Sequence, residues 1–175
     1  MSEPPSPSTC GHRAAAAGRT ARCAVVVVSD TRTADTDESG PLARRLLESA
    51  GHTVVHGAIV PNGEERVRED VAALLERDDV DVIVLSGGTG LSARDRTVEA
   101  VRPLFERELP GFGELFRWVS YTEQVGTAAL LTRALAGIAH GRLIVVLPGS
   151  KAAVELALTR LLLPELAHLL HELRR

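Results

Sequence analysis

Short runs of apolar, mostly β-branched residues recur along the chain, and segments with helical spacing separate them. A run without polar interruptions predicts a strand that is buried on both faces of a sheet. The pattern predicts strands at residues 23–28, 52–60, 82–85 and 143–147.

Between these runs, apolar residues recur every three or four positions, which predicts helices. In the first helix Leu42, Leu46 and Leu47 share one face, Ser39 is a candidate N-cap, and Gly51 marks the end. Because strands alternate with helices, the chain is predicted to form an α/β fold with a parallel sheet covered on both faces.

The later helices are less regular in sequence. They are predicted at residues 67–75, 97–106, 114–118 and 126–136, with Thr97 as the cap of the second. Residues 109–113 break the helical period. A Leu- and Ala-rich helix follows residue 151, and Pro164 either kinks it or starts a second helix.

Length and composition limit the class of protein. The 175 residues suit one domain. Residues 1–20 contain Pro, Ser, Ala and Gly without the apolar core of a signal peptide, so we expect a flexible tail before a single domain at residues 21–175.

Charge and hydropathy argue against two kinds of partner. The net charge is −3, and no dense basic patch is visible, which argues against nucleic-acid binding. The apolar runs are well short of the roughly 18 residues that span a bilayer. Cys10 and Cys23 lack metal-ligand spacing and indicate no disulfide framework, so we expect a cytoplasmic location.

Candidate chemistry is concentrated in residues 81–100, which read DVIVLSGGTGLSARDRTVEA. A buried strand runs directly into Gly87, Gly88 and Gly90, which let the backbone approach a ligand closely. Asp95 follows, just before a predicted helix. A strand, a glycine turn and a helix start can bind anions through free N–H groups, although an ordinary strand-to-helix turn has the same pattern.

The carboxyl ends of parallel strands meet at one edge of the sheet, where the ligand crevice of such folds lies. This rule brings together Ser29-Asp30, the Pro61-Asn62 turn, residues 86–95 and residues 148–151. Acids beside an anion loop suggest Mg²⁺ held jointly by carboxylate and phosphate. Asp30 and Asp37 can alternatively cap turns, and Lys151 can be a solvated lysine in the first turn of a helix.

Several motifs resemble those of the molybdopterin-binding family that includes MoaB, MogA and the gephyrin G domain. They are VSDTRT, DESG, LSGGTGLSARDRTVEA, ELPGFGELFR and LPGSKAAV, and the likeness extends from Cys23 to about Leu166. The segment 101–150 is most similar to MoaB. The resemblance implies a three-layer α/β/α fold, a homotrimer or hexamer, and adenylylation of molybdopterin with Mg²⁺ and ATP. It also implies contact with other molybdenum cofactor enzymes.

The resemblance also implies roles for individual residues. Asp95 corresponds to the acid required for adenylyl transfer, where it would position Mg²⁺ and the triphosphate, and Asn62 stands where the family usually has an acid. The remaining implied substrate- and nucleotide-binding residues are Ser29, Asp30, Asp37, Ser39, Gly40, Ser86, Gly87, Gly88, Thr89, Gly90, Arg94, Pro148, Gly149, Ser150 and Lys151.

Three functions stay open at the level of sequence. The retained Asp95 and glycine loop favour a molybdopterin adenylyltransferase, whereas Asn62 favours a carrier that binds molybdopterin without adenylylating it. A general nucleotide-binding domain is less favoured, because the sequence has neither a Walker A nor a G-x-G-x-x-G pattern. Leu109, Phe112 and Phe116 are either core residues or subunit contacts.

Overall fold

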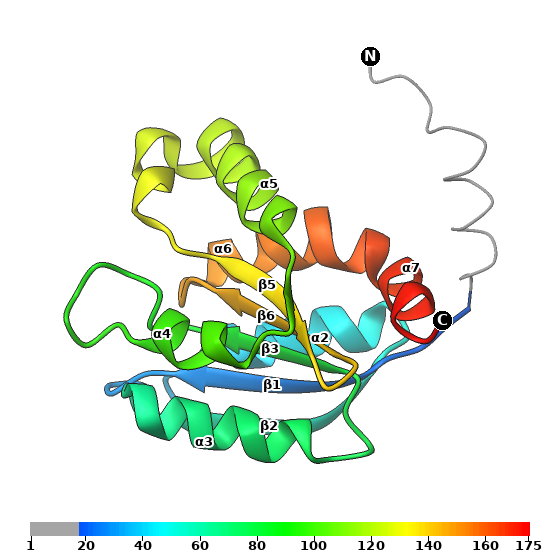
Figure 1. Ribbon diagram of the computed structural model, residues 1–175. Helices are drawn as coiled ribbons and strands as arrows, with labels where there is room; N and C mark the ends of the chain where they lie inside the picture. Colours follow the sequence, from blue (N-terminus) through cyan, green and yellow to red (C-terminus); the bar gives the residue numbers. More distant parts are fainter. Residues whose placement is uncertain (1–17) are drawn as a thin grey trace.

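A six-stranded sheet in the order β2-β1-β3-β6-β5-β4 runs through the middle of the protein (Figure 1). The computed structural model describes residues 18–175. Strands β2, β1, β3 and β6 are parallel, whereas β5 and β4 join antiparallel. The strands are β1 (Arg22–Val28), β2 (Thr53–Val60), β3 (Val82–Ser86), β4 (Arg107–Glu108), β5 (Leu135–Ala139) and β6 (Arg142–Leu147).

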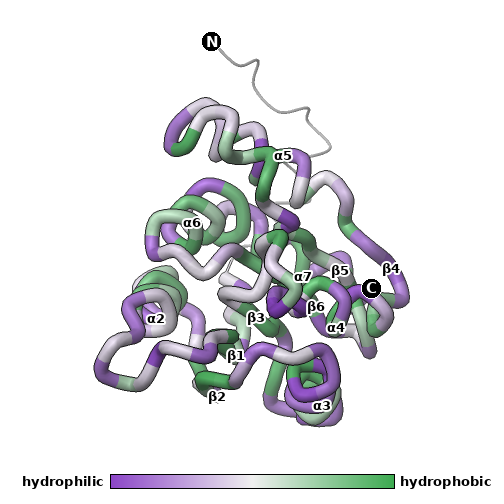
Figure 2. Tube along the Cα trace, turned by 90° about the vertical axis from the view of Figure 1, so that its left-hand side faces the viewer, coloured by the Kyte–Doolittle hydropathy of each residue, from purple (hydrophilic) through white to green (hydrophobic). Residues whose placement is uncertain are grey.

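Helices cover both faces of this sheet, because alternate residues of each central strand point to opposite sides. Val82 and Val84 of β3 pack in one apolar cluster with α2, α5, α6 and α7, and Ile83 and Leu85 pack in another with α3 and α4. Figure 2 shows α2 and α6 apart from α3, with the central strands between them. The helices are α2 (Ser39–Ser49), α3 (Glu64–Leu75), α4 (Thr97–Val101), α5 (Pro110–Ser120), α6 (Lys151–Leu156) and α7 (Leu163–Leu173).

The predicted α/β class and the mostly parallel, three-layer architecture are therefore confirmed. All residues of β3 and all but the first of β1 and β6 are buried, as their uninterrupted apolar runs indicate. The chain order of the strands reverses at β1, which has β2 on one side and β3 on the other.

The helix predicted at residues 126–136 is wrong. Residues Gly126–Leu131 form the 3₁₀ helix η3, and Leu135 begins strand β5. His140 and Gly141 both have positive φ angles, 49° and 70°, and connect β5 to β6 as a two-residue hairpin turn. Two such residues match the twist of the flanking strands, so β5 forms despite its Ala-rich sequence.

The region between α4 and β5 also differs from its prediction. Helix α4 ends at Val101 and continues only as the 3₁₀ turn η1 (Arg102–Leu104), so no helix reaches residue 106. Residues 110–113 do not break a helix but begin α5, because Pro110 occupies its first turn, where a missing N–H costs nothing. The π-helical turn η2 (Tyr121–Val125) then leads into η3.

The two alternatives for Pro164 are combined in the C-terminal segment. Helix α6 leads without a break through the π-helical turn η4 (Ala157–Leu162) into α7, and Pro164 lies in the first turn of α7. Pro164 therefore follows a π-helical irregularity within one continuous helical run, at the start of its last part.

Two expectations concern the chain as a whole. Most of the predicted tail, residues 1–17, lies outside the described part of the chain. Within residues 18–175, no helix combines the length and apolar character needed to cross a membrane.

Burial, and secondly the charge of Asp81, raise the pKa of the Cys23 thiol to about 12, so this buried cysteine stays protonated.

Candidate functional site

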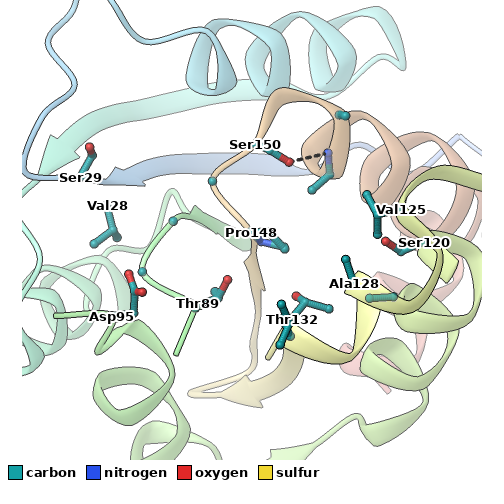
Figure 3. A pocket seen from close by; sticks show the side chains of 18 of the residues that line it. Val28, Ser29, Thr89, Asp95, Ser120, Val125, Ala128, Thr132, Pro148 and Ser150 are labelled. Atoms are coloured by element: carbon teal, nitrogen blue, oxygen red, sulfur yellow. Dashed lines mark hydrogen bonds between the residues drawn. The ribbon is translucent and has the colours of Figure 1, made fainter. Parts of the chain in front are cut away.

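A pocket of about 820 Å³ lies beyond the carboxyl ends of the parallel strands (Figure 3). It is lined by residues that follow β1, β2, β3 and β6, and it lies where the strand order reverses between β1 and β3. This is where the geometry of doubly wound sheets leaves a crevice between adjacent crossovers.

The strand ends are packed directly on one another, so the floor of the pocket is backbone. The Gly87 N–H donates to the carbonyl of Leu147 at 2.9 Å. A Cβ atom on Gly87 would lie 2.2 Å from the carbonyl oxygen of Val28, and Gly87 has a φ of +114°. Only glycine fits here, and its presence lets the ends of β1, β3 and β6 meet.

The glycine loop presents unpaired amides to this floor. The loop carbonyl of Gly88 accepts from Thr97 N–H, yet among residues 18–175 the N–H groups of Gly88, Thr89, Gly90 and Leu91 find no hydrogen-bond partner. Consecutive free N–H groups form a concave positive surface suited to phosphate oxygens.

Two carboxylates flank the loop. Asp95 lines the pocket, and its Oδ2 accepts from the Ser92 N–H at 3.2 Å. Asp30 accepts from the Asn62 backbone N–H at 2.9 Å and from its side-chain Nδ2 at 3.2 Å. The Asn62 amide therefore fixes the orientation of Asp30 and adds no negative charge of its own.

The opposite wall of the pocket is mostly apolar and comes from α5, η2 and η3. Figure 3 shows Ser120, Val125, Ala128 and Thr132 on this side of Pro148, with Ser29 and Asp95 on the other. An anion-binding end and an apolar end with a few hydroxyl groups fit a phosphorylated ligand that carries a flat ring.

Most of the predicted site residues line this pocket. Its lining includes Ser29, Asp30, Asn62, Gly87, Gly88, Thr89, Gly90, Arg94, Asp95, Pro148, Gly149 and Ser150. Ser86 lies just beneath, buried, and its hydroxyl donates to the Pro148 carbonyl at 3.3 Å. Ser150 caps α6 by accepting from the Ala153 N–H at 3.2 Å, the dashed line in Figure 3.

Besides Ser86, four predicted residues lie outside this lining, namely Asp37, Ser39, Gly40 and Lys151. Asp37 and Gly40 border a separate cavity of about 710 Å³ beside the edge strand β2, and Lys151 is exposed at the start of α6. Asp37 accepts from the Ser39 N–H at 2.9 Å and the Gly40 N–H at 3.1 Å. Asp37, and not Ser39, therefore satisfies the amides at the start of α2.

Thr97 also differs from its expected role as a cap. It forms no cap hydrogen bond, and its buried Oγ1 has no partner among the described residues, nor does the Oδ1 of Asn62. Both atoms lie against the space where a Gly88 side chain would be, at 2.1 Å and 2.9 Å from an added Cβ.

Sequence reasoning missed the whole apolar wall. Phe116, Ser120, Gln124, Val125 and Thr132 line the pocket from segments that follow no strand of the parallel set. Phe116 lies in the ELPGFGELFR motif but was predicted only as a core residue or subunit contact, and the other four lie in no motif. The path of the chain through η2 and η3 brings them to the pocket.

A metal ion in this pocket would need oxygen ligands from elsewhere. No group of three or more His, Cys, Asp or Glu side chains is placed to hold a metal anywhere in residues 18–175. Asp95 and Asp30 are acceptable Mg²⁺ ligands, because Mg²⁺ commonly takes one or two carboxylates and completes its shell with substrate phosphates and water.

Comparison with known proteins agrees with this geometry. A family described as "Probable molybdopterin binding domain" matches residues 24–168. A molybdenum cofactor biosynthesis protein B from Halalkalibacterium halodurans is 48% identical over 157 residues, which cover 90% of this chain and 92% of that protein.

Solved structures give the same result. A crystal structure of molybdenum cofactor biosynthesis protein B matches with a TM-score of 0.88 and 46% identity, over 91% of this chain and 99% of that one. The tungsten cofactor synthesizing protein MoaB from Pyrococcus furiosus matches with a TM-score of 0.79 and 39% identity, over 91% and 100% of the two chains. Since the match covers nearly all of the fold, this chain belongs to the molybdopterin-binding family of molybdenum cofactor biosynthesis proteins.

Proposed function

We propose that the protein is a molybdopterin adenylyltransferase, which transfers AMP from ATP to the phosphate of molybdopterin and releases pyrophosphate. Its role in molybdenum cofactor biosynthesis follows from the family. The observation that most favours adenylyl transfer is the meeting of three unpaired loop amides, those of Gly88, Thr89 and Gly90, with Asp95 in one pocket.

The loop amides supply the anion-binding part of this reaction. A triphosphate laid along residues 88–90 would receive N–H donors without rearrangement of the backbone, because these groups have no partners within residues 18–175 to give up. Arg94, which also lines the pocket, adds a positive charge at the same end.

The carboxylates are suited to a magnesium-bound nucleotide. Asp95 and Asp30 would share the ion with the phosphates, and Mg²⁺ when bound neutralises charge that builds up on the leaving pyrophosphate. Without a cation these acids would repel a triphosphate bound in the same pocket, so their presence there supports a metal-bound substrate.

The protein itself needs no covalent step. The molybdopterin phosphate oxygen attacks the α-phosphorus, a new O–P bond forms, and the bond to the β-phosphate oxygen breaks with its electron pair on pyrophosphate. Catalysis then depends on holding the two phosphates in line, for which the apolar wall beside Phe116 and Val125 offers a place for a ring system.

A carrier that binds molybdopterin without adenylylating it is the second candidate. Asn62 favours it, because this side chain donates to Asp30 and supplies no charge to Mg²⁺. The two candidates differ in one product, pyrophosphate.

The deciding experiment incubates the purified protein with molybdopterin and Mg-ATP and measures pyrophosphate. An enzyme releases it in proportion to adenylylated product, whereas a carrier binds molybdopterin and releases none. We expect Asp95→Ala to abolish turnover with the fold intact by circular dichroism. Asp70→Asn, which alters a surface carboxylate of α3 paired with Arg66, is the control and should leave turnover unchanged. Wild-type turnover in Asp95→Ala would refute the assigned role.

We also propose that the protein assembles as a homotrimer, or as a hexamer built from such trimers. Phe116 is in the core, and Leu109 and Phe112 pack against it. The exposed apolar side chains are instead on the outside of the same segment: Leu115, Trp118, Tyr121 and Leu130, with 51–82% of their surface exposed. Light scattering at micromolar concentration tests the assembly, and a monomeric mass would exclude it.

A further inference from the structure

Arg133 lies between η3 and β5 and reaches the glycine loop from behind the pocket. Its guanidinium makes three different contacts. Nε donates to the carbonyl of Thr89 at 3.1 Å, Nη2 donates to the carbonyl of Asp95 at 2.8 Å, and Nη1 donates to the Glu99 carboxylate. One side chain therefore holds both ends of the loop from Thr89 to Asp95.

The loop has little else to fix its shape. Between these two residues the hydrogen bonds are local, from the N–H groups of Ser92, Arg94 and Asp95 to side chains or carbonyls within three residues. Leu91, at the tip, is 71% exposed and has no anchoring contact in the core. The contacts to Arg133 are thus the long-range restraint on the segment.

The contact at Thr89 also sets the direction of an amide. In a trans peptide unit the C=O and the following N–H point in opposite directions. Because the Thr89 carbonyl points to Arg133, the Gly90 N–H points away from Arg133, and it is one of the amides without an internal partner. Gly90 lines the pocket.

A chain of ion pairs holds Arg133 itself in place. Glu99 contacts both Arg133 and Arg96, and Arg96 contacts Glu64 of α3 at 2.6 Å. The hydrogen bond from Arg133 leads the effects that lower the pKa of Glu99, so this carboxylate stays charged in mild acid. Arg133 is half-buried, with 29% of its side chain exposed, which favours a fixed position over a mobile one.

The residues next to Arg133 in the chain connect its loop contacts to the apolar wall of the pocket. Leu131 and Thr132, directly before it, line the apolar wall of the pocket. The same three residues therefore touch the ring-binding wall and the phosphate-binding loop, which are otherwise separate parts of the chain.

We propose that Arg133 is a positioning residue that clamps the loop from Thr89 to Asp95 and fixes its spacing from the apolar wall. The inference rests on the proposed function for its kinetic consequence, but the clamp is a property of the loop and can be measured without any reaction. Arg133 touches no substrate in this account and acts through the loop carbonyls and the wall.

Amide hydrogen exchange of the free protein tests the clamp directly. In Arg133→Ala we expect the amides of Ser92, Arg94 and Asp95, which are hydrogen-bonded within the loop, to exchange at least tenfold faster, with no change in the amides of β3. Arg66→Ala removes a surface arginine of α3 that forms an ion pair with Asp70, and it is the matched control. Unchanged exchange of the Ser92, Arg94 and Asp95 amides in Arg133→Ala would overturn the proposal, whatever the activity of the protein.

Kinetics separate positioning from simple loss of folded protein. We expect Arg133→Ala to raise the KM for Mg-ATP and to lower kcat/KM by roughly 100-fold, since small misplacement of binding groups has effects of this size. A lower kcat with unchanged KM would indicate fewer folded molecules and would count against positioning. Added guanidinium, at concentrations far below those that unfold proteins, should restore part of the activity of Arg133→Ala but not of Asp95→Ala.

Arg133→Lys keeps the charge and can make only some of the contacts, so we expect an intermediate KM and intermediate exchange. If Arg133→Ala does not fold, Arg133→Lys tests the clamp instead. Wild-type exchange and wild-type KM in Arg133→Lys would overturn the clamp, because a single positive charge would then be enough to hold the loop. If the wild-type protein shows no adenylylation, only the proposed function is refuted. The exchange measurements test the clamp independently of that result.

Discussion

Adding one methyl group at Gly88 should be among the most damaging single changes near the pocket. An added Cβ would lie 2.1 Å from Thr97 Oγ1 and 2.9 Å from Asn62 Oδ1. Thr97 is fully buried, so its side chain cannot swing into solvent. Gly88 also has a φ of +65°, a conformation that favours glycine.

The magnitude of the effect has two parts. The left-handed backbone costs alanine about 1–2 kcal/mol relative to glycine. Crowding a packed site costs about 1–3 kcal/mol more. We therefore expect Gly88→Ala to lower the free energy of unfolding by roughly 2–5 kcal/mol. Gly111→Ala is the control, because nothing lies within 4 Å of an added Cβ there.

A double-mutant cycle measured by urea unfolding separates the two parts. Thr97→Ala removes the closest atom, so Gly88→Ala should cost at least about 1 kcal/mol less in that background than in the wild type. If the two substitutions prove additive, the steric explanation is wrong. If Gly88→Ala is no more destabilising than Gly111→Ala, both parts of the reasoning fail.

Two further changes test side-chain contacts outside the glycine loop. Asp81 accepts hydrogen bonds from Arg22 and Arg174; burial alone would raise its pKa, but these bonds outweigh burial and lower it. Because the folded pKa is lowered, the stabilisation is present at neutral pH and is lost as the pH falls through the folded pKa. Asp81→Asn should cost roughly 1–3 kcal/mol at pH 7 and progressively less below about pH 4, measured by urea unfolding against pH, and a constant difference would contradict this. Ser150→Ala removes the cap on Ala153 and should lower the unfolding free energy by about 1 kcal/mol, with Ser150→Thr close to wild type; equal loss in both variants would argue against capping.

The parallel part of the fold could be predicted from sequence because each strand there is a continuous apolar run. Strand β5 could not, since LAGIA reads equally well as helix or strand. The signal that distinguishes them is His140-Gly141, whose positive φ angles make the hairpin. Local propensity was overridden at this point by pairing with β6.

The candidate site likewise contains residues that could be predicted from sequence and residues that could not. Residues that follow parallel strands, such as Asp30, Asn62 and Asp95, line one pocket, as topology predicts when it brings strand ends together. Asp37 fits the capping alternative, since its carboxylate accepts from Ser39 and Gly40 amides. Arg133 was not anticipated, because its partners are backbone carbonyls 44 and 38 residues away and carbonyls leave no mark in a sequence.

The two ends of the pocket differ in how they are built. Strand termini locked by Gly87 form one end, whereas short 3₁₀ and π-helical turns form the other. Substitutions in residues 121–132 can therefore change the shape of the apolar wall while the strand ends stay untouched. For protein engineering, this makes the irregular wall the place to diversify in a library, with the strand termini and Arg133 held constant as the frame.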